Sequence, residues 1–237
     1  MRQLLATAAV LSLLAAPAQS GMIPAPPGLH AGDVYERIFV TSSKYSVTSD
    51  TSVPPLTGVF GGLAAADYQV TLSAYQAGLI PDWNGHDILW HAILSTSTVD
   101  ARDRVSVPGP VYNTQNELIA TSFADLWDGA IAHPVRYDES GVEVLLGSRV
   151  WTGSNALGQN GGLQNANDWT NPSAQASTAD PNRSDGGWLA SGQRTANVVT
   201  RLYAFSDPIT VVPEPSSFIM LGLGAAGLLL AARRRRA

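Results

Sequence analysis

The C-terminal end of the chain constrains its fold more than any other part. The stretch 218–232 contains 15 residues without a charge, and four arginines follow it directly. As a helix, this run would extend for about 22 Å at ~1.5 Å per residue, whereas the hydrocarbon core of a bilayer is about 30 Å thick. The run therefore predicts a short transmembrane helix that anchors the chain only weakly.

The arginines predict which side of the membrane each part of the chain occupies. A core helix of a soluble domain is the alternative interpretation, but such a helix seldom ends a chain with no polar face. Excess Lys and Arg stay on the cytoplasmic side. The C-terminus is therefore expected inside, the bulk of the chain outside, and the membrane is a predicted partner. Four residues set this topology: Arg233, Arg234, Arg235 and Arg236.

A proline-rich motif precedes the apolar run and is formed by Val212, Pro213, Glu214 and Pro215. With the short apolar helix and the basic tail, it resembles the PEP-CTERM sorting signal of bacterial envelope proteins. The resemblance implies processing by an exosortase, a multi-pass membrane enzyme that removes the helix near this motif. The prolines fix φ and remove N–H donors, which keeps this backbone extended and accessible. We assign 208–237 to the sorting signal, with the motif at 212–215, the helix at 218–232 and the basic tail at 233–236.

The N-terminus predicts export as well. Arg2 supplies a positive region, residues 4–16 are apolar, and Ala16 and Ala18 form an A-x-A cleavage pattern. Cleavage after Ser20 fits almost as well. A membrane span is the alternative, but the run is short. We expect a signal peptide at 1–20 and a protein that is briefly membrane-anchored and then located in the bacterial cell envelope, at the surface or outside the cell.

Composition limits the kinds of partner and of functional site that the exported part can have. The formal net charge of the 237 residues is −5 and only 14% of them are charged, against about 25% in ordinary soluble proteins. Nucleic acid is not an expected partner, because the only dense basic cluster is the terminal arginine block. There are no cysteines, which excludes disulfides, thiol catalysis and thiolate metal sites. Stability must come from packing, helped by 6 Trp, 7 Tyr and 5 Phe.

The first half of the exported part contains the clearest secondary-structure signals. A Gly- and Pro-rich stretch, 21–34, predicts a flexible leader, and 35–41 predicts the first strand. The best helix is expected at 63–77, ended by Gly78. Its core stripe follows helical spacing: Leu63, Ala66, Val70 and Ala74.

The rest of the chain indicates short strands joined by Gly-, Asn- and Ser-rich loops. The predicted elements are a turn at 82–85, a strand at 88–94, a turn and short helix within 95–104, a hairpin of 111–112 with 117–121, and strands at 142–146 and 149–152.

A second resemblance rests on six fragments in order: Ile38–Ser43, Gly61–Asp67, Ala92–Thr98 with Ala101–Arg104, Ala124–Gly129, Val150–Asn155 and Leu202–Phe205. Together they resemble a bacterial surface domain family of unknown function, related to the endostatin-like branch of the C-type-lectin-like fold. The resemblance implies one α+β domain at 35–207, with one main helix, short antiparallel strands and long loops. The family usually has cysteines where this chain has Val70 and Ala204, so their contact is expected to persist without a covalent bridge.

Catalytic and metal patterns are scarce. His86 and His91 are five residues apart and fall on different faces of a helix or strand, which disfavours a chelating pair. No common hydrolase or phosphate-loop motif occurs. We therefore expect no enzyme and no metal ligands. The alternative is a secreted hydrolase that uses the carboxylates Asp125 and Glu139.

Two loop regions suggest ligand binding. Ca²⁺ requires oxygen ligands at near-alternate positions. The stretch that approximates this pattern consists of Asp180, Asn182, Ser184, Asp185 and Gly186. Two positions of the usual calcium-binding loop are occupied by residues of the wrong type. Trp169 and Trp188, with amides such as Asn167, are candidates for stacking on sugar rings, and burial of both indoles is the alternative. The leading hypothesis is an exported, exosortase-processed protein whose non-catalytic domain binds glycan, exopolysaccharide or matrix. No cofactor is expected, with Ca²⁺ as an option.

Overall fold

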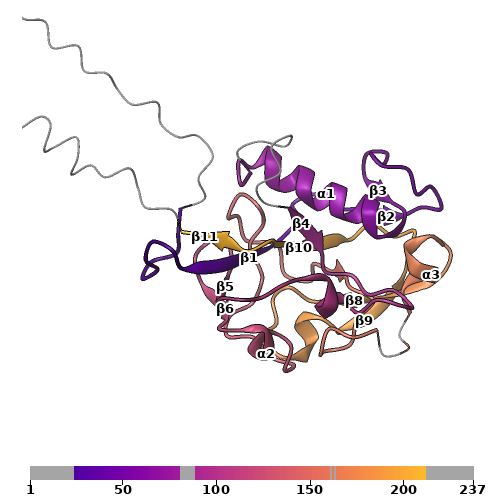
Figure 1. The fold of residues 1–237 in the computed structure, drawn as a ribbon. Helices are drawn as coiled ribbons and strands as arrows, with labels where there is room; N and C mark the ends of the chain where they lie inside the picture. The colour runs from indigo at the N-terminus through magenta and orange to yellow at the C-terminus, as the bar shows by residue number, and fades with distance from the viewer. Residues whose placement is uncertain (1–23, 81–88, 161, 163, 212–237) are drawn as a thin grey trace, which may run out of the picture.

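The computed structural model describes residues 24–80, 89–160, 162 and 164–211 (Figure 1). Two strands from opposite ends of this part form its centre. β1 (Val34–Val40) pairs antiparallel with β10 (Arg201–Ser206), and Ile38 lies opposite Phe205. Both strands are buried along almost their whole length, which explains their largely apolar sequences. The predicted first strand is confirmed within one residue at each end.

The main sheet has nine strands and mixed direction. Its order is β6-β5-β1-β10-β7-β8-β9, with β11 beside β1 and β4 beside β10. The remaining strands are β4 (Trp90–Ala92), β5 (Val111–Tyr112), β6 (Leu118–Ala120), β7 (Val150–Trp151), β8 (Gln175–Ala179), β9 (Gly192–Thr195) and β11 (Ile209–Thr210). A separate pair is formed by β2 (Ser46–Val47) and β3 (Val59–Phe60).

The expectation of antiparallel strands is wrong for three pairs. β1 with β5, β10 with β7, and β2 with β3 run parallel. In each case a long connection, not a tight turn, separates the two strands in sequence, which is the condition that parallel pairing requires. The predicted hairpin is confirmed, because β5 and β6 are antiparallel.

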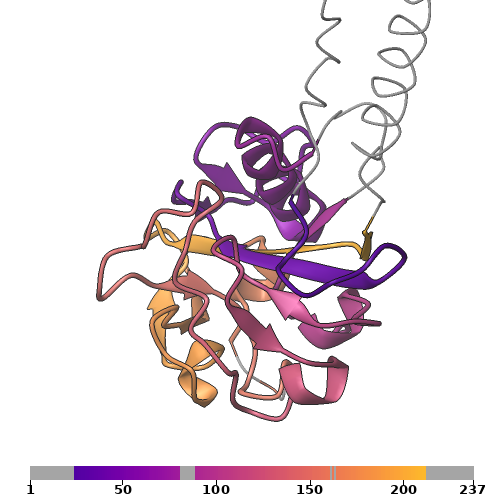
Figure 2. The same ribbon diagram turned by 90° about the vertical axis from the view of Figure 1, so that its left-hand side faces the viewer.

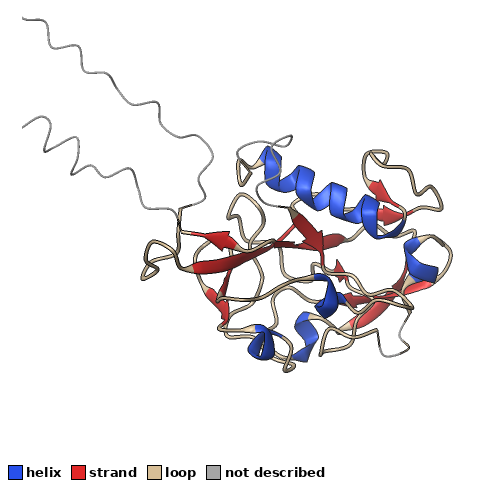
Figure 3. Ribbon diagram, in the orientation of Figure 1, coloured by secondary structure: helices blue, strands red, loops and turns tan. Residues whose placement is uncertain are grey.

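The main helix, α1 (Gly62–Gln76), lies along one side of the central strands (Figures 1 and 3). It buries Ala66, Val70 and Ala74 fully, as the predicted stripe requires, while Leu63 is partly buried. Gly78 adopts φ +74°, its N–H donates to Tyr75, and the next N–H donates to Ala74. This is a Schellman ending, which glycine favours because it adopts positive φ without a steric cost.

Four further helices of three or four residues interrupt the loops. They are η1 (Ala101–Arg104), α2 (Phe123–Leu126), α3 (Ala166–Trp169) and η2 (Gly186–Trp188). η1 confirms the short helix predicted within 95–104. The mixed α+β class with one main helix is therefore confirmed.

The central strands separate two hydrophobic clusters. Ile38 and Phe205 belong to the first, whereas the neighbouring Phe39 and Ala204 belong to the second, beneath α1. This alternation follows from the two-residue period of a strand. Val70 and Ala204 both belong to the second cluster, which places them in the same apolar core.

The described chain enters and leaves the fold at one place. β11 pairs with the start of β1, the Gly32 N–H donates to the Val211 carbonyl at 2.9 Å, and the Val211 N–H donates to Asp33 at 2.8 Å. Figure 2 shows β1 and the C-terminal strand side by side. The sheet thus extends into both predicted flanks: Val34 belongs to the segment expected as a leader, and β11 to the segment expected as sorting signal.

Three predicted segments differ or lie outside the described part. Residues 142–146 form no strand; only Glu143 bridges to Tyr137, while Leu145 and Leu146 are 80% and 86% exposed. The predicted turn at 82–85 and the predicted C-terminal helix lie outside the described residues. Within the described ranges, no helix is both long enough and apolar enough to cross a bilayer.

Candidate functional site

The two tryptophans suggested for sugar stacking are both fully buried. The Trp169 indole N–H donates to the Ser95 carbonyl at 2.8 Å, and its ring lies 6.1 Å from the Trp151 ring. The Trp188 ring lies 5.9 Å from each of the Trp127 and Tyr203 rings. Stacking on a sugar needs an exposed ring face. The hypothesis that these two tryptophans stack on sugar rings is therefore wrong, because both indoles belong to the hydrophobic core.

Asn167, the amide suggested beside them, is exposed. It lies in a tight turn, with φ +52°, and its Nδ2 donates to Thr170 Oγ1 at 3.4 Å. The amide is thus presented to solvent away from any exposed indole, since Trp169 is turned into the core.

The two aspartates of the suggested calcium loop bind arginines. Asp180 accepts from Arg149 Nη1 at 3.0 Å, and Asp185 accepts from Arg183 Nη2 at 2.5 Å. Hydrogen bonding to Arg183 holds the pKa of Asp185 below its usual value. No group of three or more His, Asp or Glu side chains with metal-binding geometry occurs in the ranges that the structure describes.

The carboxylates of the hydrolase alternative each stabilise a loop. Asp125 accepts from the Thr121 N–H at 2.7 Å and from its hydroxyl at 2.9 Å. Glu139 accepts from the Ser42 N–H at 2.8 Å and from the Ser42 hydroxyl. The Asp125 contact is the kind of local turn contact that short polar side chains commonly make, whereas Glu139 joins two loops that are distant in sequence.

His91 takes part in an ionic cluster that joins four elements. Its Nε2 lies 3.1 Å from Asp207, its Nδ1 lies 3.8 Å from Asp67, and Arg104 Nη2 lies 2.6 Å from Asp67. The interaction with the Asp67 carboxylate is the main reason that the pKa of His91 is raised, although burial opposes it. The cluster ties α1, β4 and η1 to the end of β10. His86 lies outside the described residues.

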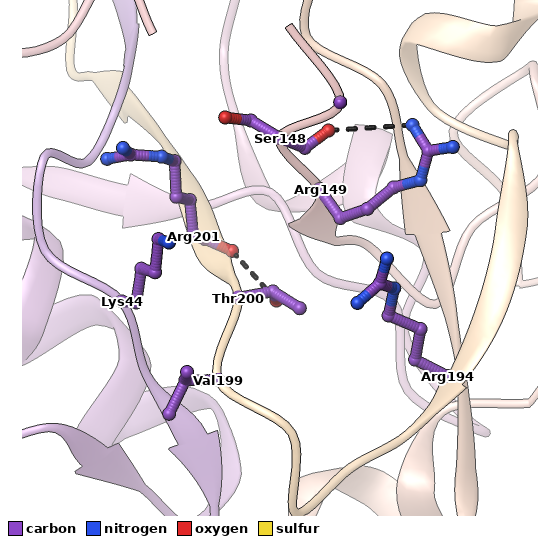
Figure 4. Close-up of a pocket in the computed structure, with 8 residues that line it drawn as sticks. Lys44, Ser148, Arg149, Arg194, Val199, Thr200 and Arg201 are labelled. Atoms are coloured by element: carbon purple, nitrogen blue, oxygen red, sulfur yellow. Dashed lines mark hydrogen bonds between the residues drawn. The ribbon is translucent and has the colours of Figure 1, made fainter. Parts of the chain in front are cut away.

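A separate pocket gathers four cationic side chains. It has a volume of about 90 Å³ and is lined by Lys44, Gly147, Ser148, Arg149, Arg194, Val199, Thr200 and Arg201. Figure 4 shows Lys44 and Arg201 on one side, with Arg149 and Arg194 on the other. We call this feature the basic pocket.

Strand pairing brings these distant residues together. A bridge between Tyr45 and Thr200 places Lys44 beside the start of β10, where Arg201 lies. The Arg201 N–H donates to the Arg149 carbonyl at 3.0 Å, which joins the starts of β10 and β7. Arg194 comes from β9.

The four cations differ in how firmly they are held. Arg149 binds Asp180 at 3.0 Å. Arg201 Nη1 donates to the carbonyls of Thr41 and Ser42 at 2.6 and 2.5 Å. Lys44 and Arg194 are exposed and have no side-chain hydrogen bond or ion pair to any described residue.

Sequence reasoning missed the basic pocket. Its cations are single residues at positions 44, 149, 194 and 201, and only 194 and 201 lie within one stretch of the chain. No local pattern joins them, because the pairing of β10 with β7 and the bridge at Tyr45 create the cluster.

Comparison with protein families matches residues 211–236 to the PEP-CTERM protein-sorting motif. The match begins directly after β11 and covers the motif at 212–215 together with the four arginines. No curated protein matches the chain. The motif supports an exported protein that an exosortase sorts to the cell envelope or surface.

Proposed function

We propose that the protein is an exported component of the cell envelope or extracellular polysaccharide layer, processed by an exosortase-like enzyme. Its folded part would be a non-catalytic, C-type-lectin-like module that binds glycan or matrix. The observation that carries the proposal is the sorting motif at 211–236, placed directly after the last strand of the domain. A membrane helix at 218–232 would tether the chain until processing releases it.

The position of the cut suits this proposal. The last described hydrogen bonds of the domain involve Val211, and the motif starts at the next residue. Removal of the segment after the motif would therefore leave the pairing of β11 with β1 in place. Folding and processing are thus separable in the chain.

A binding role suits the folded part better than hydrolysis. The two carboxylates considered for hydrolysis already accept hydrogen bonds from backbone and hydroxyl groups: Asp125 from Thr121 in its own loop, and Glu139 from Ser42 in a distant loop. A glycosidase needs two carboxyl groups about 5–9 Å apart in a cleft. The proposal requires no cofactor.

We expect Glu214→Ala to block C-terminal processing without changing folding. Glu214 is the one charged group of the motif, and it follows the last residue of the described part of the chain, Val211. Intact mass of protein from the native host, from membrane and from medium, measures the outcome. The wild type should lack roughly the first 18–20 and last 20–25 residues, while the variant should keep the arginine tail.

Glu143→Ala is the matched control, because it removes an exposed glutamate from the folded part. It should be processed as the wild type is. Normal processing of Glu214→Ala would contradict the proposed recognition, and a wild-type protein that keeps its arginine tail everywhere would contradict processing altogether.

A further inference from the structure

We propose that the basic pocket binds one acidic group, a carboxylate or sulfate, of an acidic polysaccharide. This inference deepens the proposed function, on which its choice of a glycan as ligand rests. The site lies between the first turn after β1 and the starts of β7 and β10, with β9 on its far side.

Charge is the first argument. The chain carries a formal net charge of −5, yet four cations line one pocket. Two carboxylates lie close by: Asp180 binds Arg149, and Glu139 binds Ser42. Lys44 and Arg194 remain without a carboxylate partner among the described residues. Like charges held together destabilise a fold, so an anion between them relieves this repulsion.

Preorganisation is the second argument. Arg201 is fixed by two backbone carbonyls, and Arg149 by a carboxylate at 3.0 Å. The Nε of Arg201 is buried and has no hydrogen-bond partner among the described residues. Guanidinium groups suit planar oxyanions because their N–H donors match two oxygens at once. Arg149 and Arg201 are thus held in place, while the exposed side chains of Lys44 and Arg194 can adjust to a bound anion.

Size is the third argument. The pocket has a volume of about 90 Å³, which leaves room for one carboxylate or sulfate beside the lining cations. The rest of the sugar would extend from the pocket towards solvent. A single acidic sugar would bind weakly, and a polymer that presents many such groups gains from their high local concentration.

The double variant Lys44→Gln/Arg194→Gln tests the site. Both side chains are exposed and have no ion-pair partner among the described residues, so the fold should persist. We expect affinity for immobilised polyuronate to fall roughly tenfold, because the variant loses two exposed cations that would pair with acidic groups of the polymer. Wild-type binding should weaken with added salt, and the variant should depend less on salt.

The matched control is Arg102→Gln/Arg183→Gln, which removes the same charge outside the pocket from arginines that pair with nearby aspartates. The protein is used as it is recovered from the host, whether or not its C-terminal segment has been removed. The result therefore does not depend on exosortase cleavage. Neutral dextran and vesicles with anionic phospholipid serve as competing ligands, the latter because Leu145 and Leu146 are exposed beside Gly147.

Loss of polyuronate binding in the pocket variant alone supports the proposal. Three outcomes overturn it: equal loss in the control variant, which indicates non-specific charge attraction; equal binding to neutral dextran; or binding to anionic vesicles only. Failure of processing with intact polyuronate binding would contradict the proposed sorting and leave the pocket assignment standing.

Discussion

Replacing Trp188 by alanine should lower the free energy of unfolding by about 3–5 kcal/mol. The side chain is fully buried at the end of η2 and packs between the rings of Trp127 and Tyr203, each 5.9 Å away. Alanine would leave a large cavity, because the two remaining rings, Trp127 and Tyr203, come from different parts of the chain and cannot collapse into the space. The Tyr203 hydroxyl donates to the backbone carbonyl of Trp188, which anchors that ring in place.

Chemical denaturation measures this effect. The control is Leu146→Ala, at a side chain that is 86% exposed, and it should change stability by less than about 0.5 kcal/mol. If Trp188→Ala unfolded at the wild-type midpoint while glycan binding was lost, the indole would be a ligand contact after all, and the corrected stacking platform would have to be restored.

The second large effect concerns the buried carboxyl of Glu36. This side chain in β1 is fully buried, and neither carboxyl oxygen has a hydrogen-bond partner among the described residues. Burial raises its pKa from 4.5 to about 7, and the backbone of Gly109 opposes this only in part. A buried carboxylate without a counter-ion is costly, so the group is protonated over much of the acidic range.

The raised pKa makes stability depend on pH in a stated direction. Between about 4.5 and about 7 the folded protein keeps the proton of Glu36 that the unfolded chain releases. Stability therefore falls as pH rises through this window and levels off above it. A difference of about 2.5 pKa units corresponds to about 3 kcal/mol at ~1.4 kcal/mol per unit.

Glu36→Gln should remove this dependence. The variant and the wild type should be about equally stable near pH 4.5, and the variant should be more stable by about 3 kcal/mol at pH 8. Urea denaturation at several pH values measures the difference. Glu143→Gln removes a carboxylate that is more than half exposed and is the control for charge loss. A stability difference that does not change with pH would contradict the burial of an ionisable Glu36.

Two polar side chains are buried in the centre of β1, and the sequence pattern does not predict their burial. Glu36 and Arg37 are neighbours in a strand whose two faces are both covered, so neither points to solvent as alternation would suggest. The Nη1 and Nη2 atoms of Arg37 donate to the carbonyls of Asn113 and Pro24, at 2.9 and 2.6 Å, and to the Asn116 side chain. These partners lie far away in sequence, and only the tertiary fold supplies them.

The same limit explains the misassigned residues. Trp169 and Trp188 lie among Asn and Gly residues that normally mark exposed loops. The loops that carry them turn the indoles inward, where they pack on Trp151 and on Tyr203. Local sequence indicates a loop, but it does not indicate which side chain of the loop faces the core.

The sequence by itself determined the local and modular features of this protein. The helix ending at Gly78 and the strand 35–41 follow from periodicity and capping, which depend on neighbouring residues alone. The sorting motif at 212–215 acts as a linear signal, and the family match at 211–236 confirms it. Tertiary structure alone decided the rest: the parallel pairing of β10 with β7, the burial of Glu36, and the placing of Lys44 and Arg194 around one pocket. Each depends on contacts between residues that are distant along the chain. A local sequence pattern does not indicate which distant residues come into contact, because strand pairing decides this.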